Sequence, residues 1–421
     1  MKTETDVLVR AKGAGPASRF AEVRAASLQI AAPLSPEDCA AQSMPEASPI
    51  RWHLAHTSWF FETFVIARAV PGQRPFDPHF AYLFNSYYNA IGERVPQAER
   101  GRITRPGLEE ILDYRRHVDL RVAEILDRAD AQTLAQVEPI LEIGLNHEQQ
   151  HQELMLTDLK HLLSLYPLRP VYRDSVRSVS TATSPMRFLR FEGGLHEIGH
   201  AGPGFAFDNE GPRHRVFTEP FELAARPVTN GEYLEFVAGG GYRDPQAWLS
   251  DGWDWVVAAG IRAPEYWSEE ERGWRIFTLA GERELDPSEP VAHVSFYEAD
   301  AFARWSGARL PRENEWELAA TPLPVEGNFA ESGALHPRAS ASSAMFGDVW
   351  EWTQSPYVAY PGFRPAAGAL GEYNGKFMCN RMVLRGGSCA SPRSHLRASY
   401  RNFFVPTARW QFTGIRLARD V

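Results

Sequence analysis

The stretch PILEIGLNHEQQHQELMLTDLKHLL, residues 139–163, sets two histidines within a long apolar pattern. On a helix, His147 and His151 lie four residues apart on one face, so their rings can converge on a single ion. Such a pair can also be an ordinary solvated polar face. Here the flanking apolar residues indicate that the face turns partly into a helical bundle, where buried imidazoles need a polar partner. The pattern therefore favours a metal-ligand pair.

The sequence on both sides of this stretch is helical in pattern from residue 16 to residue 165. Apolar residues recur at three- and four-residue intervals, as in amphipathic helices. Pro106 suits the first turn of a third helix, and Pro139 is expected to end or kink the first part of a fourth. The segment 76–105 lacks periodicity and is long for a passive connection, so we expect it to line a site. We predict an antiparallel four-helix bundle, with helices in residues 17–34, 48–70, 105–129 and 130–167.

A polar stretch rich in Ser and Thr, residues 168–186, indicates a linker. Beyond it, short strand-like pieces alternate with Gly, Pro and Asn. Only residues 229–239 and 295–307 show a clear helical pattern there. The prediction is two domains: an all-α four-helix bundle over 1–167, and an α+β domain rich in irregular loops over 187–421.

The composition narrows the class of protein. The chain has 421 residues and a formal net charge of −9, which argues against nucleic acid or anionic membranes as partners. No apolar run reaches membrane-spanning length, and the N-terminal stretch lacks the apolar core of a signal peptide. Three cysteines are too few for a disulfide scaffold in so long a chain. We therefore expect a cytoplasmic protein that binds neither nucleic acid nor membranes.

Residues 147–151 also fit H-E-x-x-H, the motif of zinc peptidases. Those enzymes take a third metal ligand from further along the chain. Leu154 and Thr157 stand where the extended motif has Gly and His, and no glutamate occurs between Glu153 and Glu192. A zinc peptidase is thus an alternative from another enzyme class, but it lacks its expected third ligand.

A third ligand can come from WHLAH, residues 52–56, on the second predicted helix. Metal sites in helical bundles are built from side chains on facing helices. The spacing does not choose between His53 and His56, and three imidazoles suit zinc, iron or copper. From the residues alone we predict an imidazole-rich metal site whose reaction is undetermined.

The chain also resembles a known family over almost its whole length. WHLAH, NSYYNAIG and HEQQHQE resemble the DinB-type helical domain of ergothioneine-biosynthesis sulfoxide synthases, the EgtB-like enzymes. RPVTNGEYLEFV, GDVWEWT, LRGGSC and FTGIRLARD resemble their second domain. That domain has the formylglycine-generating-enzyme/sulfatase-modifying fold, a variant of the C-type-lectin fold, and the resemblance implies that it closes the active site.

The resemblance implies a mononuclear non-haem Fe(II) enzyme. Such enzymes use O2 to join cysteine, or gamma-glutamylcysteine, to the imidazole C2 of hercynine (N-alpha-trimethylhistidine) and give a sulfoxide. Carried over to this sequence, the iron ligands are His56, His147 and His151. His53 becomes a supporting residue, and Gln150 matches a position near the hercynine imidazole.

The resemblance also suggests a proton donor and a binding site for the thiol substrate. Tyr87 and Tyr88 resemble the tyrosine that donates a proton or a hydrogen bond in the reaction, a role that suits a phenol. Some relatives place this tyrosine in the second domain, where Tyr373 is the candidate and ranks below the other two. Arg102 and Arg105 match arginines that bind the substrate carboxylate, for which a guanidinium offers a bidentate contact.

The segment YRNFFVPTARWQF, residues 400–412, matches the family segment that closes over the site. Asn402 would hold the hercynine carboxylate, and Phe403 would lie near the trimethylammonium group, a contact of roughly 0.5–2 kcal/mol. The branch that uses gamma-glutamylcysteine has an acidic residue near this position, where this chain has Phe403 and Phe404, which favours free cysteine. No second cysteine follows Cys389, unlike in formylglycine-generating enzymes, so we expect a buried structural thiol.

The leading hypothesis is a sulfoxide synthase that acts on hercynine and cysteine. Related reactions on histidine, or with a selenium donor, stay open. So does a non-catalytic protein in which the lectin-like domain binds a ligand. Glu148 and Glu153 are candidates to orient the ligand rings as hydrogen-bond acceptors.

Overall fold

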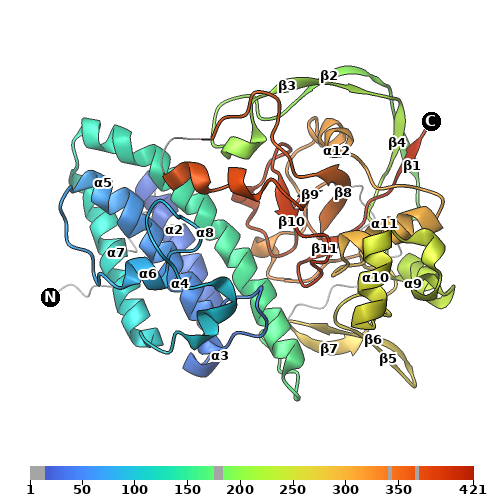
Figure 1. Cartoon of the computed structure of the whole chain (residues 1–421), viewed down its shortest axis with the longest axis horizontal. Helices are drawn as coiled ribbons and strands as arrows, with labels where there is room; N and C mark the ends of the chain where they lie inside the picture. The colour runs from blue at the N-terminus through green and yellow to red at the C-terminus, as the bar shows by residue number, and fades with distance from the viewer. Residues whose placement is uncertain (1–14, 175–183, 340–343, 366–368) are drawn as a thin grey trace. The chain divides into compact units, whose positions relative to one another are not determined.

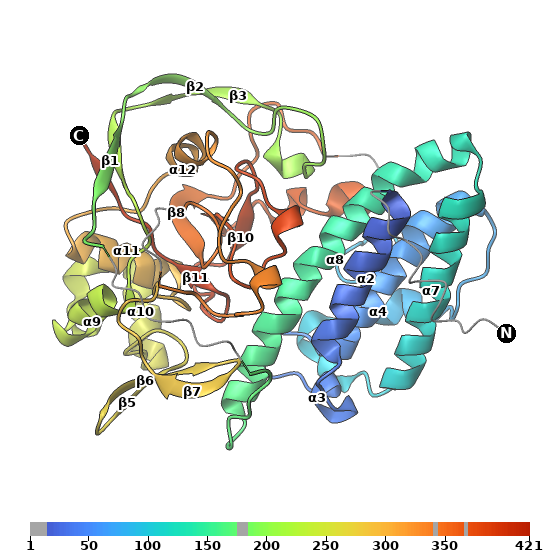
Figure 2. The same cartoon turned by 180° about the vertical axis from the view of Figure 1, so that it is seen from behind.

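The computed structural model describes residues 15–174, 184–339, 344–365 and 369–421. The chain forms two compact units, which confirms a helical domain followed by an α+β domain (Figures 1 and 2). The helical unit holds residues 1–165 and 368–373, and the α+β unit holds residues 166–367 and 374–421. The middle of the predicted linker and most of the stretch inspected for a signal peptide lie outside the described residues. No described helix is long and apolar enough to cross a membrane.

Four long helical segments run alongside one another in the helical unit (Figure 1). They are α2 (Pro16–Ala31), α4 (Ile50–Phe60), α7 (Leu108–Arg128) and α8 (Ala131–Leu165), with α4 continued by a π-helix, η1 (Phe61–Ile66), and by α5 (Ala67–Ala69). Short helices lie between them: α3 (Pro36–Ala40), α6 (Phe80–Leu83) and the 3-10 helix η2 (Gln97–Arg102). Phe20, Val23, Val118, Val122 and Leu145 are buried where the long helices meet, as the amphipathic pattern predicts.

Two predictions about helix boundaries can be compared with the structure. Pro139 was expected to end or kink the fourth helix, and it does not end it, because α8 is continuous through Pro139. The buried side chains of Val137 and Leu141 hold both sides of the proline against the bundle, which offsets the lost hydrogen bond. The third helix begins at Leu108 and not at Pro106, since Gly107 has the extended backbone of an N-cap.

The described residues of the α+β unit form four small sheets, with strand orders β1-β4-β12, β10-β9-β8-β11, β2-β3 and β5-β6-β7. The strands are β1 (Phe188–Phe191), β2 (Gly194–Ile198), β3 (His214–Thr218), β4 (Phe221–Ala224), β5 (Trp267–Glu270), β6 (Gly273–Thr278), β7 (Gly281–Glu284), β8 (Trp350–Pro356), β9 (Met382–Arg385), β10 (Asn402–Phe404), β11 (Thr413–Gly414) and β12 (Ala418–Asp420). All pairs are antiparallel except β11 with β8. The strand-like pieces of the sequence, residues 186–200, 214–230 and 382–392, each contain strands: β1 and β2, β3 and β4, and β9.

Four α-helices accompany these sheets: α9 (Asn230–Ala238), α10 (Ser250–Ala259), α11 (Phe296–Trp305) and α12 (Glu313–Ala320). Single 3-10 turns are η3 (Asp208–Glu210), η4 (Gly241–Arg243), η5 (Pro245–Ala247), η6 (Ala330–Ser332), η8 (Gly375–Phe377) and η9 (Arg393–His395), while η7 (Ala369–Glu372) belongs to the helical unit. The two predicted helices are α9 and α11, and capping boxes at Thr229 and Ser295 begin them.

The sequence did not predict α10 and α12. Gly252 lowers the helix propensity of α10, but it packs so tightly that an added Cβ would lie 2.7 Å from Cγ of Tyr297. Tertiary packing therefore stabilises α10. The eight residues of α12 are too few for a clear periodic signal, and the buried Trp316 holds this helix in the core.

The strand β10 is fixed by a buried ion-pair cluster. Glu313 accepts hydrogen bonds from Arg401 at 2.9 and 3.0 Å, and from Arg385 at 2.8 Å. Arg401 also donates to the carbonyl of Asn209 at 2.9 Å. Because Arg401 immediately precedes Asn402, this cluster holds the strand that carries Asn402 and Phe403 in place.

Candidate metal centre

Three histidines converge in the core of the helical unit. His56 comes from α4, and His147 and His151 come from consecutive turns of α8. One ring nitrogen of each lies within 4.8 Å of those of the other two, and Nε2 of His56 is 3.1 Å from Nε2 of His147. All three side chains are buried. The sequence pattern predicted this meeting of the second and fourth helices.

The structure also distinguishes the two histidines of WHLAH. His56 points Nε2 toward His147, while its Nδ1 donates a hydrogen bond to the carbonyl of Phe84 at 2.6 Å. His53 instead contacts Nδ1 of His151. His56 is therefore the third member of the cluster. Phe84 lies in the segment 76–105, which was expected to line a site.

The protonation of the histidines suits a metal. Burial lowers the pKa of His56 and of His151 well below the ordinary value, and the neighbouring histidines lower both further. Burial likewise lowers the pKa of His147 to about 3. Metal binding needs neutral imidazoles with a free lone pair. Three buried neutral rings with converging nitrogens fit a divalent transition metal. Such a metal would bind the lone pairs of these ring nitrogens, which otherwise face one another.

Glu148 has a different role from the glutamate of a zinc peptidase. Its carboxylate accepts hydrogen bonds from Arg24 at 2.9 Å, from Ser27 at 2.5 Å and from Arg115. Burial acts to raise the pKa of Glu148, but the guanidinium groups of Arg115 and Arg24 outweigh it and lower that pKa to about 2. A carboxylate held this way is neither a general base nor an acceptor for the histidine rings. The ring-orienting role expected of Glu148 is therefore wrong, and its contacts do not support the peptidase alternative.

Three tyrosines lie around the histidines. Tyr373 donates a hydrogen bond to Oε1 of Gln150, and its ring centroid is 5.5 Å from that of His147. Tyr87 is half-buried, with its ring 6.0 Å from that of Tyr373 and 4.7 Å from that of Tyr88. Burial, with smaller effects of Tyr87 and Tyr373, raises the pKa of the fully buried Tyr88. Among the three, Tyr373 ranks lowest from the sequence, because only some relatives place this tyrosine in the second domain.

A glutamate late in the chain holds the loop that carries Tyr87 and Tyr88. The carboxylate of Glu372 accepts the backbone N–H groups of Asn89 at 3.0 Å and of Ala90 at 2.8 Å. Both Glu372 and Tyr373 belong to the helical unit although they follow most of the α+β unit in sequence. No pattern in the neighbouring sequence predicts that these two residues belong to the helical unit.

The arginines of the segment 100–105 differ in burial. Arg102 is 79% exposed and pairs with Glu99 at 3.3 Å, and Arg105 is also exposed. Arg100 is buried instead, with its guanidinium 3.4 Å from the centroid of the Trp52 ring. The substrate-binding role of Arg102 and Arg105 therefore stays a prediction.

Asn402 and Phe403 lie on β10 of the α+β unit. The Asn402 side chain accepts the N–H of Phe403 at 2.9 Å. The Phe403 ring stacks on Tyr357, with centroids 4.0 Å apart and 11° between the planes. One face of Phe403 is thus covered by Tyr357, and the contact with a trimethylammonium group stays a prediction. Cys389 is buried, as expected.

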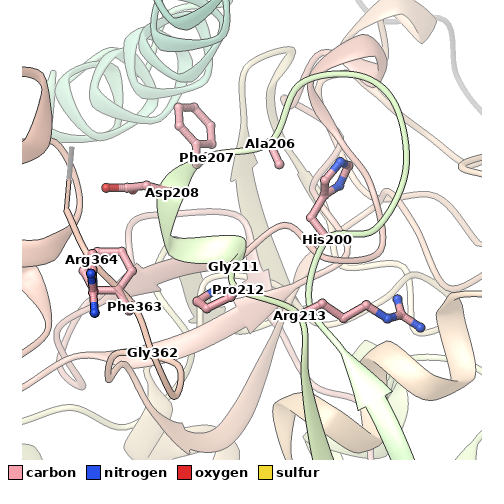
Figure 3. Close-up of a pocket in the computed structure, with 10 residues that line it drawn as sticks. All are labelled: His200, Ala206, Phe207, Asp208, Gly211, Pro212, Arg213, Gly362, Phe363 and Arg364. Carbon is pink, nitrogen blue, oxygen red and sulfur yellow. The ribbon is translucent and has the colours of Figure 1, made fainter.

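The α+β unit contains a cavity of about 400 Å³ that the sequence did not indicate. Its lining residues lie within 200–213 and 362–364, and Figure 3 labels Phe207, which immediately precedes η3, and Asp208, the first residue of η3. Asn374 donates a hydrogen bond to Asp208 at 2.7 Å, and burial raises the pKa of that carboxyl. The cavity combines two phenylalanine rings and one partly buried acid with the basic side chains of His200, Arg213 and Arg364.

Comparison with protein families matches both parts of the chain. Residues 19–155 match the DinB superfamily, and residues 175–344 and 330–421 match the sulfatase-modifying factor enzyme 1-like domain. These are the two domain types that the sequence motifs resembled.

Three relatives extend this similarity. The hercynine oxygenase of Mycolicibacterium thermoresistibile is 33% identical over 415 residues, which cover 90% of this chain and 88% of the relative. That of Mycobacterium tuberculosis is 33% identical over 440 residues, covering 96% and 98%. Ergothioneine biosynthesis protein 1 of Schizosaccharomyces pombe is 28% identical over 232 residues, covering 51% of this chain and 28% of the relative.

Proposed function

The chain belongs to the hercynine oxygenase family, and we propose that it joins cysteine to the imidazole C2 of hercynine in an O2-dependent reaction that gives a sulfoxide. The observation that carries this proposal is the buried cluster of three neutral histidines within a chain that aligns with hercynine oxygenases along nearly its whole length. Three protein ligands leave open positions on a metal for substrates.

The reaction balances without a further reductant. Forming the C–S bond removes two electrons and two protons from the thiol and the imidazole, and oxidising the sulfur to the sulfoxide removes two more electrons. One O2 accepts these four electrons, so that one oxygen atom enters the sulfoxide and the other leaves as water. Fe(II), held by His56, His147 and His151, would bind the thiolate and activate O2.

The remaining residues bind the substrates and handle protons. Gln150 orients the hercynine imidazole through its side-chain amide. Tyr373, whose hydroxyl already donates to Gln150, and Tyr87 and Tyr88 are the candidate proton donors. A phenol keeps its proton at neutral pH and can release it to a developing base.

Charged and aromatic groups would set substrate preference. Arg102 and Arg105 bind the carboxylate of the thiol substrate, and Asn402 binds the carboxylate of hercynine. Phe403 offers an aromatic contact to the trimethylammonium group. The branch that uses gamma-glutamylcysteine has an acid near the position of Phe403 and Phe404, and this chain has none there, so free cysteine is the proposed thiol donor.

Oxygen uptake by the purified, Fe(II)-loaded protein tests the proposal, with hercynine and cysteine added singly and together. We expect uptake only with both substrates, and a product mass equal to their sum plus one oxygen and less two hydrogens. Histidine and gamma-glutamylcysteine, substituted one at a time, test the preference. Iron-loaded protein that consumes no O2 with any of these pairs would refute the substrate assignment.

A further inference from the structure

Two buried residues behind the histidine cluster take no part in the proposed reaction. Nε2 of His53 lies 3.2 Å from Oδ2 of Asp158, and Nδ1 of His53 lies 2.7 Å from Nδ1 of His151. The side chains of His53 and Asp158 are buried between α4 and α8. The line Asp158–His53–His151 therefore leads from a carboxylate to one member of the cluster.

The carboxylate determines where the hydrogens lie along this line. Oδ2 of Asp158 accepts the backbone N–H of Ser48 at 2.8 Å, so this oxygen acts as an acceptor toward His53 as well. A contact of 2.7 Å between two ring nitrogens needs one donor and one acceptor. In its neutral form His53 carries its one N–H on Nε2, toward the carboxylate, and offers the lone pair of Nδ1 as the acceptor. Opposite this form of His53, His151 carries its hydrogen on Nδ1.

This arrangement frees Nε2 of His151 for a metal. His56 reaches the same tautomer by an independent contact, because its Nδ1 donates to the carbonyl of Phe84 at 2.6 Å. A hydrogen bond to the outer nitrogen of a ligating histidine fixes both its tautomer and its ring orientation. Two members of the cluster thus have Nε2 lone pairs that are set by groups outside the cluster.

The residues around Asp158 also hold its carboxylate close to His53. Arg100 donates to Oγ of Ser48 at 2.8 Å, beside the backbone N–H that Asp158 accepts. The same guanidinium lies on the Trp52 ring, which stacks on His56 with centroids 4.6 Å apart. The carboxylate of Asp158 therefore has a second partner besides His53, the backbone N–H of Ser48.

We propose that Asp158 and His53 are positioning residues that hold His151 in the tautomer and orientation required by the metal ion of the proposed enzyme. This inference rests on the proposed metal site and adds two residues to it. Asp158 acts through His53, and neither touches the ion. It also accounts for the first histidine of WHLAH, which the ligand set leaves unused.

Metal affinity measures this role without catalysis. Anaerobic titration of the apoprotein with cobalt(II), against a competing chelator, gives the dissociation constant for each variant. His53→Phe removes the acceptor for the buried N–H of His151, and we expect cobalt(II) affinity to fall about 10–100-fold. His53→Gln supplies an amide oxygen as acceptor and should recover most of this loss. Asp158→Asn keeps an acceptor oxygen but removes the charge, so its loss should be smaller than that of His53→Phe.

A matched control separates positioning from general destabilisation. Glu62 is another buried carboxylate of the helical unit, and it accepts a hydrogen bond from the Tyr114 hydroxyl at 2.7 Å. Glu62→Gln should bind cobalt(II) within about twofold of the wild type, even if its thermal unfolding shifts. Equal losses of affinity in Glu62→Gln and His53→Phe would overturn the proposal.

Different results would refute the positioning role of His53 and the metal site itself. Wild-type cobalt(II) affinity in folded His53→Phe would overturn the positioning role, provided that His56→Ala and His147→Ala still lose the metal. Unchanged affinity in those two variants would overturn the metal site itself. If His53→Phe does not fold, nitrogen-15 NMR of the zinc-loaded wild type, labelled at histidine, tests the tautomers. We expect N–H at Nε2 of His53 and at Nδ1 of His151, and the reverse pattern would refute the inference.

Discussion

Replacing Glu148 by glutamine should destabilise the helical unit strongly while leaving its histidines in place. The Glu148 side chain is fully buried and serves two guanidinium groups, those of Arg24 and Arg115. Arg24 keeps a second partner, Asp119, at 2.6 Å. Arg115 keeps only neutral oxygens, such as Oγ1 of Thr57 at 3.2 Å. The substitution therefore leaves one buried cation without a charged partner.

Breaking a buried pair from one side costs about 3–5 kcal/mol. For a unit of this size, roughly 2–4 °C per kcal/mol gives a fall in melting temperature of roughly 6–20 °C. Thermal and urea unfolding, followed by the helical circular dichroism signal, measure the loss. Glu142→Gln is the matched control, because Glu142 pairs with Arg19 at the surface, where the side chains are 30% and 38% exposed. Its loss should be less than about 1 kcal/mol.

The result also discriminates between two roles for this glutamate. Equal stability of Glu148→Gln and Glu142→Gln would refute the argument that buried ion pairs hold these helices together. A general base, in contrast, could be replaced with little loss of stability but with loss of a hydrolytic activity. A Glu148→Gln variant that is as stable as the wild type but has lost a peptidase activity of the wild type would therefore contradict the ion-pair role of Glu148.

Four further outcomes are expected. Burial raises the pKa of Asp348 from 3.8 to about 6, so the free energy of unfolding should fall as pH rises from about 4 through 6. Asp348→Asn should stabilise the protein by up to about 3 kcal/mol at pH 8 but not at pH 4. Equal unfolding midpoints of Asp348→Asn and the wild type at pH 8 would contradict this. Tyr373→Phe should lower the rate of sulfoxide formation by about 100-fold if Tyr373 is the proton donor, and its cobalt(II) affinity should be unchanged. Tyr87→Phe and Tyr88→Phe are measured in the same assay, and the variant with the large loss of rate identifies the donor. Phe403→Ala should raise the KM for hercynine roughly 2–30-fold, which corresponds to ~0.5–2 kcal/mol; an unchanged KM would argue that this ring only packs on Tyr357. Removal of the metal with a chelator should abolish O2 uptake and lower the melting temperature, and Fe(II), but not Zn(II), should restore the uptake.

Much of the helical unit could be predicted because its helices and its histidine pair depend on residues that are close together in the sequence. The i, i+4 spacing of His147 and His151, with apolar residues on both sides, is enough by itself to indicate a shared face. The choice between His53 and His56 could not be made this way. It depends on the carbonyl of Phe84 and the carboxylate of Asp158, and no periodicity links these groups to WHLAH.

The α+β unit was harder to predict for the same reason. Capping boxes at Thr229 and Ser295 indicate two helices, but α10 is stabilised by the contact between Gly252 and Tyr297, which lie far apart in sequence. Pro139 does not end its helix, because a local rule about proline takes no account of the packing on either side. Long-range contacts thus decided each of these differences.

The return of residues 369–373 to the helical unit has a consequence for how this protein can be divided. A fragment that ends at residue 165 would retain all three histidines and the Asp158 carboxylate. It would lack Tyr373 and the Glu372 carboxylate that binds the loop of Tyr87 and Tyr88. Such a fragment could bind a metal yet present an incomplete surface around it. An engineer who exchanges the second half of the chain must therefore transplant these few residues as part of the first.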